Sequence, residues 1–136
     1  MLLHREVSDR VLRAFFDVYN EVGCGFLEKI YRRCLAIAMA EQGLRAEPEV
    51  ALPVHFRGRV IGVFRADFLV DRCLIVECKA VTALDGVHGA QVLNYLRASP
   101  IETALLLNFG KRPQFRRFIL MNHRKKSLDS GQPLSL

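Results

Sequence analysis

The sequence predicts a single α/β domain in which helices flank a mixed β-sheet. Three observations support this fold class. Two stretches near the N-terminus, and a third at about residues 86–98, repeat apolar residues at helical spacing. Between them, residues 46–79 are rich in Val, Ile, Leu and Phe and are interrupted by turn residues, as in a series of strands. A near-continuous apolar run at residues 102–109 is typical of a strand that is buried on both faces.

Composition sets limits on the class of protein. The chain has 136 residues, of which 51% are hydrophobic, so one domain with a sizeable core is expected. The net charge of +6 and the pI near 9.5 favour a polyanionic partner such as nucleic acid, but do not require one. No apolar run approaches the ~20 residues of a membrane span, and charges begin at once at the N-terminus. We therefore expect a cytoplasmic protein without a membrane partner.

Several common types of site are absent from the sequence. The four cysteines and four histidines do not have the spacing of a zinc site. There is no phosphate-binding loop of the G-x-x-x-x-G-K-[ST] type, which argues against a nucleoside triphosphatase.

Two helices are expected at the N-terminus. Ser8 is a candidate N-cap of the first helix, which Gly23 would end. The second helix would run from about Phe26 to Gln42, with an apolar stripe made of Leu27, Tyr31, Cys34, Leu35, Ala38 and Met39. With residues placed at about 100° intervals, Glu28 falls inside this stripe, so its carboxylate needs a partner. Two interpretations are open: an ion pair with an Arg, or a contribution to a polar site.

Residues 46–79 are predicted to form an antiparallel meander. The strands are expected at Val50–Phe56, Val60–Val70 and Cys73–Lys79, with a turn at Arg57-Gly58. Three charged residues interrupt the apolar pattern of the last two strands: Asp67, Glu77 and Lys79. Glu77 and Lys79 are two residues apart, so a strand points them to the same face. Charges in a buried strand need a partner or a metal ion, and a buried Glu–Lys ion pair is one interpretation.

The connection between these two strands decides whether the acidic residues meet. A two-residue turn at residues 71–72 pairs Asp67 with Val76, and Glu77 then faces away from Asp67. A three-residue loop at residues 71–73 pairs Asp67 with Glu77 and places their Cβ atoms about 5 Å apart. Two carboxylates at that distance repel each other unless a cation or a proton lies between them. A metal site therefore requires the second register or a compensating bulge.

A third helix is expected from about Gly86 to Ala98, and Asp85 can cap it. One ridge of this helix carries His88, Gln91 and Tyr95, and the neighbouring core face carries Val92, Leu93 and Leu96. The helix is long enough for a crossover, so the strand at residues 102–109 is expected to run parallel to its neighbour.

The end of the chain is expected to be less ordered. An edge strand should follow at Phe115–Met121. Residues 122–136 are polar and have no periodicity. We therefore expect one domain over residues 1–121 and a mobile tail over residues 122–136, with a loose basic patch at Arg124–Lys126.

Three short motifs resemble those of one protein superfamily. Asp67, followed ten residues later by Glu77-Cys78-Lys79, resembles the core of the PD-(D/E)XK nucleases, with Ala66 where the strict form has Pro. The stretch from Gly25 to Tyr31 resembles the signature of the GxxExxY proteins, a branch of that superfamily. The stretch from Gln91 to Tyr95 resembles the QxxxY motif of the RecB-like exonucleases. The resemblance extends over about residues 21–120, most of the chain.

This resemblance implies a restriction-endonuclease-like fold with the element order αβββαβ. It also implies an exonuclease-like nuclease that hydrolyses phosphodiester bonds, with DNA expected as substrate rather than RNA. Asp67 and Glu77 would hold Mg²⁺ or Mn²⁺, which are hard ions suited to carboxylate oxygen. The backbone carbonyl of Cys78 would be a third ligand, and Glu28 would join directly or through a water molecule. Lys79 would orient the attacking water or help to deprotonate it.

Further residues are implied to lie near the nucleic acid. Gln91 and Tyr95 would contact it or brace the site, and His88 would lie close by or at the surface. Candidates for contacts with phosphate groups are Arg32, Arg33, Arg65 and Lys111. A homo-oligomer is compatible with the sequence.

Two rival interpretations come from other classes of protein. The first is a module that binds nucleic acid or a protein partner on a nuclease scaffold that no longer cleaves. The intact set of Glu28, Asp67, Glu77 and Lys79 argues against it. The second is a structural protein with a buried ion pair, which accounts for the charges in the strands but not for the basic balance of the chain.

Overall fold

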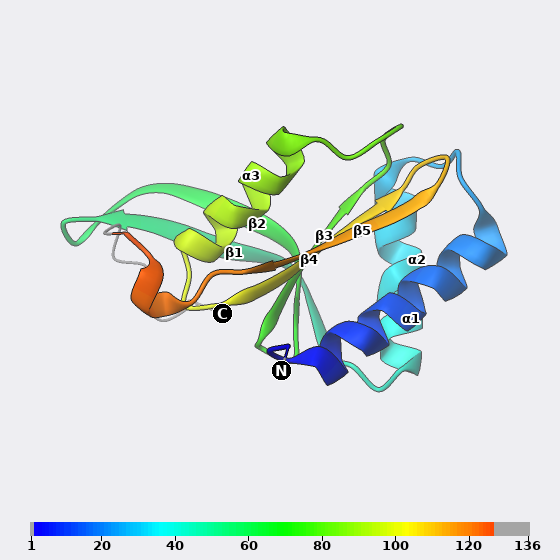
Figure 1. Cartoon of the computed structure of the whole chain (residues 1–136), viewed down its shortest axis with the longest axis horizontal. Helices are drawn as coiled ribbons and strands as arrows, with labels where there is room; N and C mark the ends of the chain where they lie inside the picture. The colour runs from blue at the N-terminus through cyan, green and yellow to red at the C-terminus, as the bar shows by residue number, and fades with distance from the viewer. Residues whose placement is uncertain (1, 127–136) are drawn as a thin grey trace.

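A five-stranded mixed sheet forms the middle layer of the molecule, with helices on both of its faces (Figure 1). The computed structural model describes residues 2–126. Its helices are α1 (Arg5–Val22), α2 (Glu28–Glu41), α3 (Gly86–Arg97) and the short 3₁₀ helix η1 (Asn122–Arg124). Its strands are β1 (Ala46–Phe56), β2 (Arg59–Val70), β3 (Leu74–Lys79), β4 (Thr103–Phe109) and β5 (Pro113–Ile119). None of the helices within residues 2–126 combines the length and hydropathy needed to cross a bilayer.

The strands follow one another in the order β1-β2-β3-β4-β5 across the sheet. β1, β2 and β3 form an antiparallel meander, and α3 then crosses over so that β4 runs parallel to β3. β5 closes the sheet as an antiparallel edge strand beside β4. The predicted mixed sheet, its parallel pair and the restriction-endonuclease-like fold are therefore confirmed.

Two apolar cores hold the layers together. On one face, α1 and α2 pack against alternate residues of β3 and β4, including Val76, Leu105 and Leu107. On the other face, α3 packs against the intervening residues, including Ile75 and Leu106. Every residue of β4 is buried, which confirms the expectation from its apolar run.

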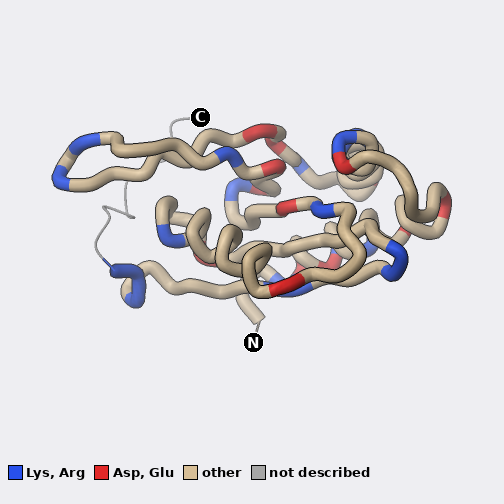
Figure 2. The backbone as a smooth tube through the Cα atoms, turned by 90° about the horizontal axis from the view of Figure 1, so that it is seen from above, with Lys and Arg blue, Asp and Glu red and all other residues tan. Residues whose placement is uncertain are grey.

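The β1–β2 hairpin extends beyond the rest of the sheet (Figure 1). Its turn is formed by Arg57 and Gly58, with φ angles of 49° and 74° that suit a two-residue hairpin turn. Arg57 and Arg59 place positive charge at the tip (Figure 2). Nearer the body of the molecule, Leu52 and Phe64 of this hairpin pack into the core that contains α3.

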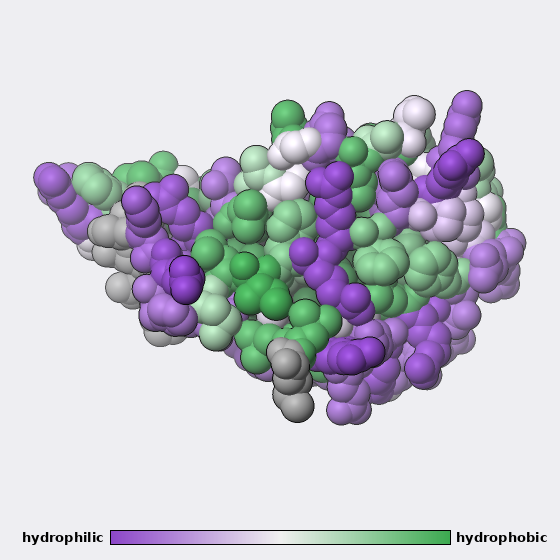
Figure 3. Space-filling view, viewed as in Figure 1, coloured by the Kyte–Doolittle hydropathy of each residue, from purple (hydrophilic) through white to green (hydrophobic). Residues whose placement is uncertain are grey.

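Some large apolar side chains remain at the surface. The space-filling view shows apolar areas that are interrupted by a band of hydrophilic side chains (Figure 3). The most exposed members among residues 2–126 include Leu27, Val60, Ile61, Val63 and Val87. Several of these lie on the β1–β2 hairpin or on α3.

The beginnings of α1 and α2 differ from the prediction. α1 begins at Arg5, and the Ser8 hydroxyl donates to the Arg5 carbonyl inside the helix, so Ser8 is not the N-cap. α2 begins at Glu28 rather than Phe26, because Gly23 and Gly25 hold the preceding backbone at positive φ. Leu27 therefore lies before the helix with its side chain 70% exposed, outside the apolar stripe.

Two further expectations are corrected. Leu93 lies on the exposed side of α3, whereas Val92 and Leu96 are fully buried as expected. Lys125 is not part of a loose basic patch, because its ammonium group donates to the carbonyls of Ser99 at 2.6 Å and Ile101 at 2.7 Å. The rest of the expected mobile tail, residues 127–136, lies outside the described residues.

Candidate active site

The β2–β3 connection has the register that brings the two acidic residues together. Asp71 and Arg72 have φ angles of 47° and 55°, and Val70 pairs with Leu74 across a three-residue loop. The last regular pair is Phe68 with Val76, so the next position along the strands places Asp67 opposite Glu77. The three-residue loop is therefore confirmed, and the alternative two-residue turn is wrong.

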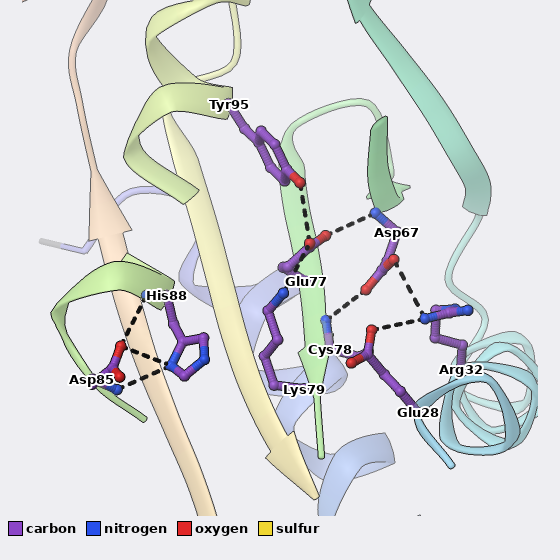
Figure 4. A network of polar contacts seen from close by, with 9 residues as sticks. All are labelled: Glu28, Arg32, Asp67, Glu77, Cys78, Lys79, Asp85, His88 and Tyr95. Carbon is purple, nitrogen blue, oxygen red and sulfur yellow. Dashed lines mark hydrogen bonds and ion pairs between the residues drawn. The ribbon is translucent and has the colours of Figure 1, made fainter. Parts of the chain in front are cut away.

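At this point the hydrogen bonds between β2 and β3 run from backbone N–H groups to the two carboxylates instead of to backbone carbonyls. The Asp67 N–H donates to Oε1 of Glu77 at 3.0 Å, and the Cys78 N–H donates to Oδ2 of Asp67 at 2.8 Å (Figure 4). Each carboxylate thus accepts a hydrogen bond from the backbone of the opposite strand. We call Asp67 and Glu77 the carboxylate pair. Its side chains are held between the strands by the same contacts that hold the strands together.

Glu77 points toward α3. It is only 4% exposed, and its Oε2 accepts a hydrogen bond of 3.2 Å from the Tyr95 hydroxyl. The Lys79 ammonium lies 3.9 Å from the same oxygen, on the face predicted by the two-residue spacing. Tyr95 therefore fixes the orientation of Glu77, and the Lys79 contact is a longer, partly solvated ion pair.

Glu28 reaches the carboxylate pair through an arginine. It is the first residue of α2, and its Oε1 lies 2.8 Å from Nη1 of Arg32, one turn along the helix. The same guanidinium nitrogen lies 3.9 Å from Oδ1 of Asp67. Around the backbone of Cys78, Glu28 thus approaches from the α2 side and Glu77 from the α3 side (Figure 4). The ion pair with an Arg is therefore confirmed for Glu28, whereas its contribution to a metal site with Asp67 and Glu77 stays a prediction.

The local fold explains why Glu28 begins a helix here. The Tyr31 hydroxyl donates to the Gly23 carbonyl at 2.7 Å and accepts from the Phe26 N–H at 3.2 Å. Gly25 between them has a φ of 111°, which favours glycine. The glycine and the tyrosine of the G-x-x-E-x-x-Y stretch therefore set the start of α2, and with it the position of Glu28.

Burial and mutual repulsion control the charge of the carboxylate pair. Burial and the nearby Asp67 charge raise the pKa of Glu77 to about 7. Burial also raises the pKa of Asp67, although the Cys78 N–H and the Arg32 charge oppose that shift. In the absence of a cation, two negative charges are therefore disfavoured here. A proton or a metal ion between the carboxylates removes the repulsion.

Two neighbouring groups are kept in their neutral forms. Burial and the Glu77 charge raise the pKa of the Tyr95 hydroxyl, which therefore remains a hydrogen-bond donor. Burial raises the pKa of the Cys78 thiol, so Cys78 does not offer a thiolate to a metal.

The donor set of the site consists of oxygen atoms. Within residues 2–126, no group of three or more His, Cys, Asp or Glu side chains is arranged to hold a metal ion. The carboxylate pair supplies two such side chains. The Cys78 N–H points toward β2, and the N–H and C=O of a strand residue point to the same edge, so the Cys78 carbonyl is directed there as well. This set fits Mg²⁺ or Mn²⁺, which bind through few carboxylates and retain several water molecules.

Of the residues predicted to contact nucleic acid, some lie near the carboxylate pair and one does not. Tyr95 is 4% exposed and braces Glu77, and Gln91 is half-buried one turn before it on α3. Arg65 is exposed on β2, two residues before Asp67. His88 is occupied elsewhere, because its Nδ1 accepts from the Asp85 N–H at 3.0 Å while the Asp85 side chain caps α3. His88 is thus part of a capping box, away from the carboxylate pair (Figure 4).

One contact was missed from the sequence. Arg32 was expected only as a phosphate contact, but it joins Glu28 to Asp67. The i, i+4 spacing of Glu28 and Arg32 was a visible signal for the first of these ion pairs. A cavity of about 290 Å³ lies on this side of the sheet and is lined in part by Lys29, Arg32, Arg33 and Asp67.

Comparison with known proteins agrees with this geometry. A family model for the PD-(D/E)XK nuclease superfamily matches residues 5–118. The crystal structure of a protein called SSO0001 is similar to the chain with a TM-score of 0.50 at 16% sequence identity. That similarity covers 87% of this chain and 58% of the other, so the chain spans less than two thirds of that structure, and the likeness concerns the fold alone. No curated protein matches the chain.

Proposed function

Because the chain belongs to the PD-(D/E)XK nuclease superfamily, we propose that it is a metal-dependent nuclease that hydrolyses phosphodiester bonds, with DNA as the favoured substrate. The observation that carries this proposal is the carboxylate pair, in which Glu77 is buried, with Lys79 beside it. The G-x-x-E-x-x-Y and Q-x-x-x-Y stretches favour the GxxExxY and RecB-like branches. Tyr95 of the second stretch donates to Glu77, and Glu28 of the first is linked to Asp67 through Arg32, which supports an exonuclease-like enzyme.

Asp67, Glu77 and the carbonyl of Cys78 would hold Mg²⁺ or Mn²⁺, with Glu28 joining through water. When bound, the metal lowers the pKa of a coordinated water and neutralises charge on the phosphate. Tyr95 keeps the Glu77 carboxylate in one orientation by donating to Oε2. Arg32 holds Glu28 close to Asp67 through two ion pairs.

Lys79 is the proposed catalytic cation. Its ammonium group lies 3.9 Å from Glu77, and its side chain is 17% exposed, so it is partly open to a ligand. It would orient the attacking water and stabilise the negative charge that develops on the phosphate oxygens. A positive charge that is already in place adds to transition-state binding without reorganisation.

The rival ion-pair interpretation explains less of the geometry. Glu77 has closer partners than Lys79, namely the Asp67 N–H at 3.0 Å and the Tyr95 hydroxyl at 3.2 Å. An isolated ion pair also gives no reason for a second carboxylate at Asp67. A scaffold that has lost its activity would need none of the four charged side chains, yet all four are present.

Replacing Glu77 by Gln tests the proposal. The amide keeps the size of the carboxylate, its oxygen can still accept from the Asp67 N–H, and its NH₂ group can donate to the Tyr95 hydroxyl oxygen, but the charge that would hold the cation is gone. We expect Glu77→Gln to be as stable as the unchanged protein, or more stable, in a thermal melt with chelator, because the repulsion from Asp67 is gone. We also expect it to lose Mn²⁺ binding in calorimetry and cleavage of end-labelled nucleic acid. Circular substrates would distinguish cleavage at an end from cleavage within a strand.

The control is Glu41→Gln, which changes an exposed carboxylate at the end of α2 and should alter none of these properties. The ion-pair interpretation predicts the opposite sign for the melt. If Glu77 serves only to pair with Lys79, removing it leaves a poorly solvated ammonium and costs up to roughly 3–5 kcal/mol. A clearly lower melting temperature with unchanged Mn²⁺ affinity would overturn the nuclease proposal.

A further inference from the structure

A second cavity adjoins the candidate active site on the α3 side of the sheet. Its volume is about 290 Å³, and it lies between β2 and α3. Its lining consists of Phe64, Val87, Ala90, Gln91, Asn94 and Tyr95. Tyr95 also donates to Glu77, so one side chain forms both a wall of this cavity and a brace of the carboxylate pair. A ligand in the cavity would therefore lie directly beside the site of the proposed chemistry.

The lining suits a flat, uncharged and partly polar group. Two aromatic rings form one side, with the centroids of Phe64 and Tyr95 5.5 Å apart. Val87 and Ala90 add apolar surface, whereas Gln91 and Asn94 offer amide donors and acceptors. No Asp, Glu, Lys or Arg side chain is among the residues that line it. The volume falls just below the about 300–1,000 Å³ of typical small-molecule sites, which favours one small ring system.

We propose that this cavity binds one unpaired nucleobase of the nucleic acid whose phosphodiester lies at the carboxylate pair. The inference rests on the proposed function and deepens it by naming the substrate class. Bases inside a duplex are stacked and paired, so only a single strand or a frayed end can place a base here. Aromatic side chains stack on bases of any sequence, and amides bond to exposed base edges.

The cavity on the opposite side of the sheet, beside α2, has a charged lining. It is lined by three cations of α2, Lys29, Arg32 and Arg33, and by the carboxylates of Glu49 and Asp67. Its cations can meet phosphate groups, whereas the α3 cavity has no charged lining. The carboxylate pair lies between these two environments, bonded to Tyr95 on one side and paired with Arg32 on the other. A single strand crossing the site can therefore place a base against α3 and its backbone against α2.

The test compares two single strands that differ only in their bases. One is a short oligothymidylate, and the other is an abasic deoxyribose-phosphate strand of the same length and charge. Binding is measured by fluorescence anisotropy in chelator, where no metal-dependent cleavage takes place. We expect the unchanged protein to bind the oligothymidylate about tenfold more tightly, a typical effect of stacking one base on an aromatic side chain.

Filling the cavity should remove this preference. Ala90 is an exposed residue of α3, so Ala90→Leu adds bulk to the cavity without touching the carboxylate pair. We expect this variant to bind both strands with the affinity that the unchanged protein shows for the abasic strand. Gln91→Ala, which opens the cavity instead of filling it, should reduce the preference in part. The matched control is Ala40→Leu, the same change at an exposed alanine of α2, which should keep the full preference.

The outcomes separate this inference from the proposed function. Equal affinity of the unchanged protein for the two strands would overturn the base site, as would a full preference in Ala90→Leu. Either result can occur while Mn²⁺ binding and cleavage depend on Glu77, in which case only this inference fails. If the unchanged protein binds neither strand and no duplex, the proposed function fails together with this inference.

Discussion

At the scale of single residues, the carboxylate pair is unusual because it lies in the middle of a sheet, with Glu77 buried and Asp67 partly buried. Ile75 and Val76, which precede Glu77 on β3, are both apolar and fully buried. An apolar residue at position 77 would avoid the cost of burying a carboxylate beside another one. The hydrogen bonds from the Asp67 N–H and from Tyr95 reduce this cost without removing the repulsion. The arrangement therefore supports the proposal that a cation binds between the two carboxylates.

The raised pKa of Glu77 predicts how stability depends on pH in chelator. In the folded protein this pKa is about 7, above the ordinary value of 4.5, so the folded state holds the proton more tightly. The resulting stabilisation is fully present below about pH 4.5 and is lost as the pH rises through 7. Its upper limit is roughly 3 kcal/mol, which urea unfolding curves at pH 5 and pH 8 can measure.

Glu77→Gln supplies the reference for this prediction, since other carboxylates titrate in the same range. The difference in unfolding free energy between the unchanged protein and this variant should fall from pH 5 to pH 8. With Mn²⁺ present, the trend should reverse for the unchanged protein, because a metal ion binds only the deprotonated carboxylates. A difference that stays constant with pH would show that Glu77 does not titrate in this range.

The sequence predicted those parts of the site that depend on a local pattern, and it did not predict the contacts that depend on how helices pack on the sheet. Asp67, Glu77 and Lys79 were visible because each breaks an apolar strand pattern. The contact of Arg32 with Asp67 depends on how α2 packs on the sheet, and no local spacing reveals that packing. Tyr95 was expected near the site, but its bond to Glu77 depends on the crossing of α3 over β3.

At the scale of elements, turn chemistry predicted the β1–β2 hairpin but left the register between β2 and β3 undecided. The Arg57-Gly58 hairpin turn was predicted directly, because that pair suits left-handed backbone. The β2–β3 connection was compatible with two loop lengths, and the choice between them reverses the face of Glu77. The structure adds Cys73 to the loop, and the packing of both strand faces selects that register.

The capping box of α3 leads to a prediction about stability. The Asp85 side chain accepts from the Val87 N–H at 2.9 Å, and His88 accepts from the Asp85 N–H at 3.0 Å. Asp85→Ala should therefore lower the free energy of unfolding by about 1 kcal/mol, as measured by urea denaturation. The control Asp17→Ala, at an exposed position within α1, should have a smaller effect.

Urea denaturation of His88→Ala, together with its affinity for single-stranded nucleic acid, decides the role of His88. If His88 only completes the cap, His88→Ala should lower stability while the affinity for single-stranded nucleic acid stays unchanged. A loss of affinity at unchanged stability would return His88 to the nucleic-acid surface that the sequence suggested.

At the scale of the whole molecule, positive charge lies beside Asp67 and at the tip of the β1–β2 hairpin. Lys29, Arg32 and Arg33 of α2 line the cavity beside Asp67, whereas Arg57 and Arg59 lie at the tip of the β1–β2 hairpin (Figure 2). The hairpin extends beyond the sheet on the same side as the C-terminal end of α3 (Figure 1). Nucleic acid longer than the site itself would therefore meet cations along its backbone.

This arrangement predicts binding that weakens with salt in proportion to the phosphate groups contacted. Each contact with a single strand releases counterions and contributes about −0.7 to the slope of log affinity against log salt concentration. Arg33→Gln should make the slope for oligothymidylate less steep by about that amount, because Arg33 lines the cavity beside Asp67. Arg13→Gln, at an exposed position of α1 outside that cavity, is the matched control and should leave the slope unchanged. Affinity that stays flat between ~50 and ~200 mM salt would contradict a phosphate-binding track, whatever the effect of either variant.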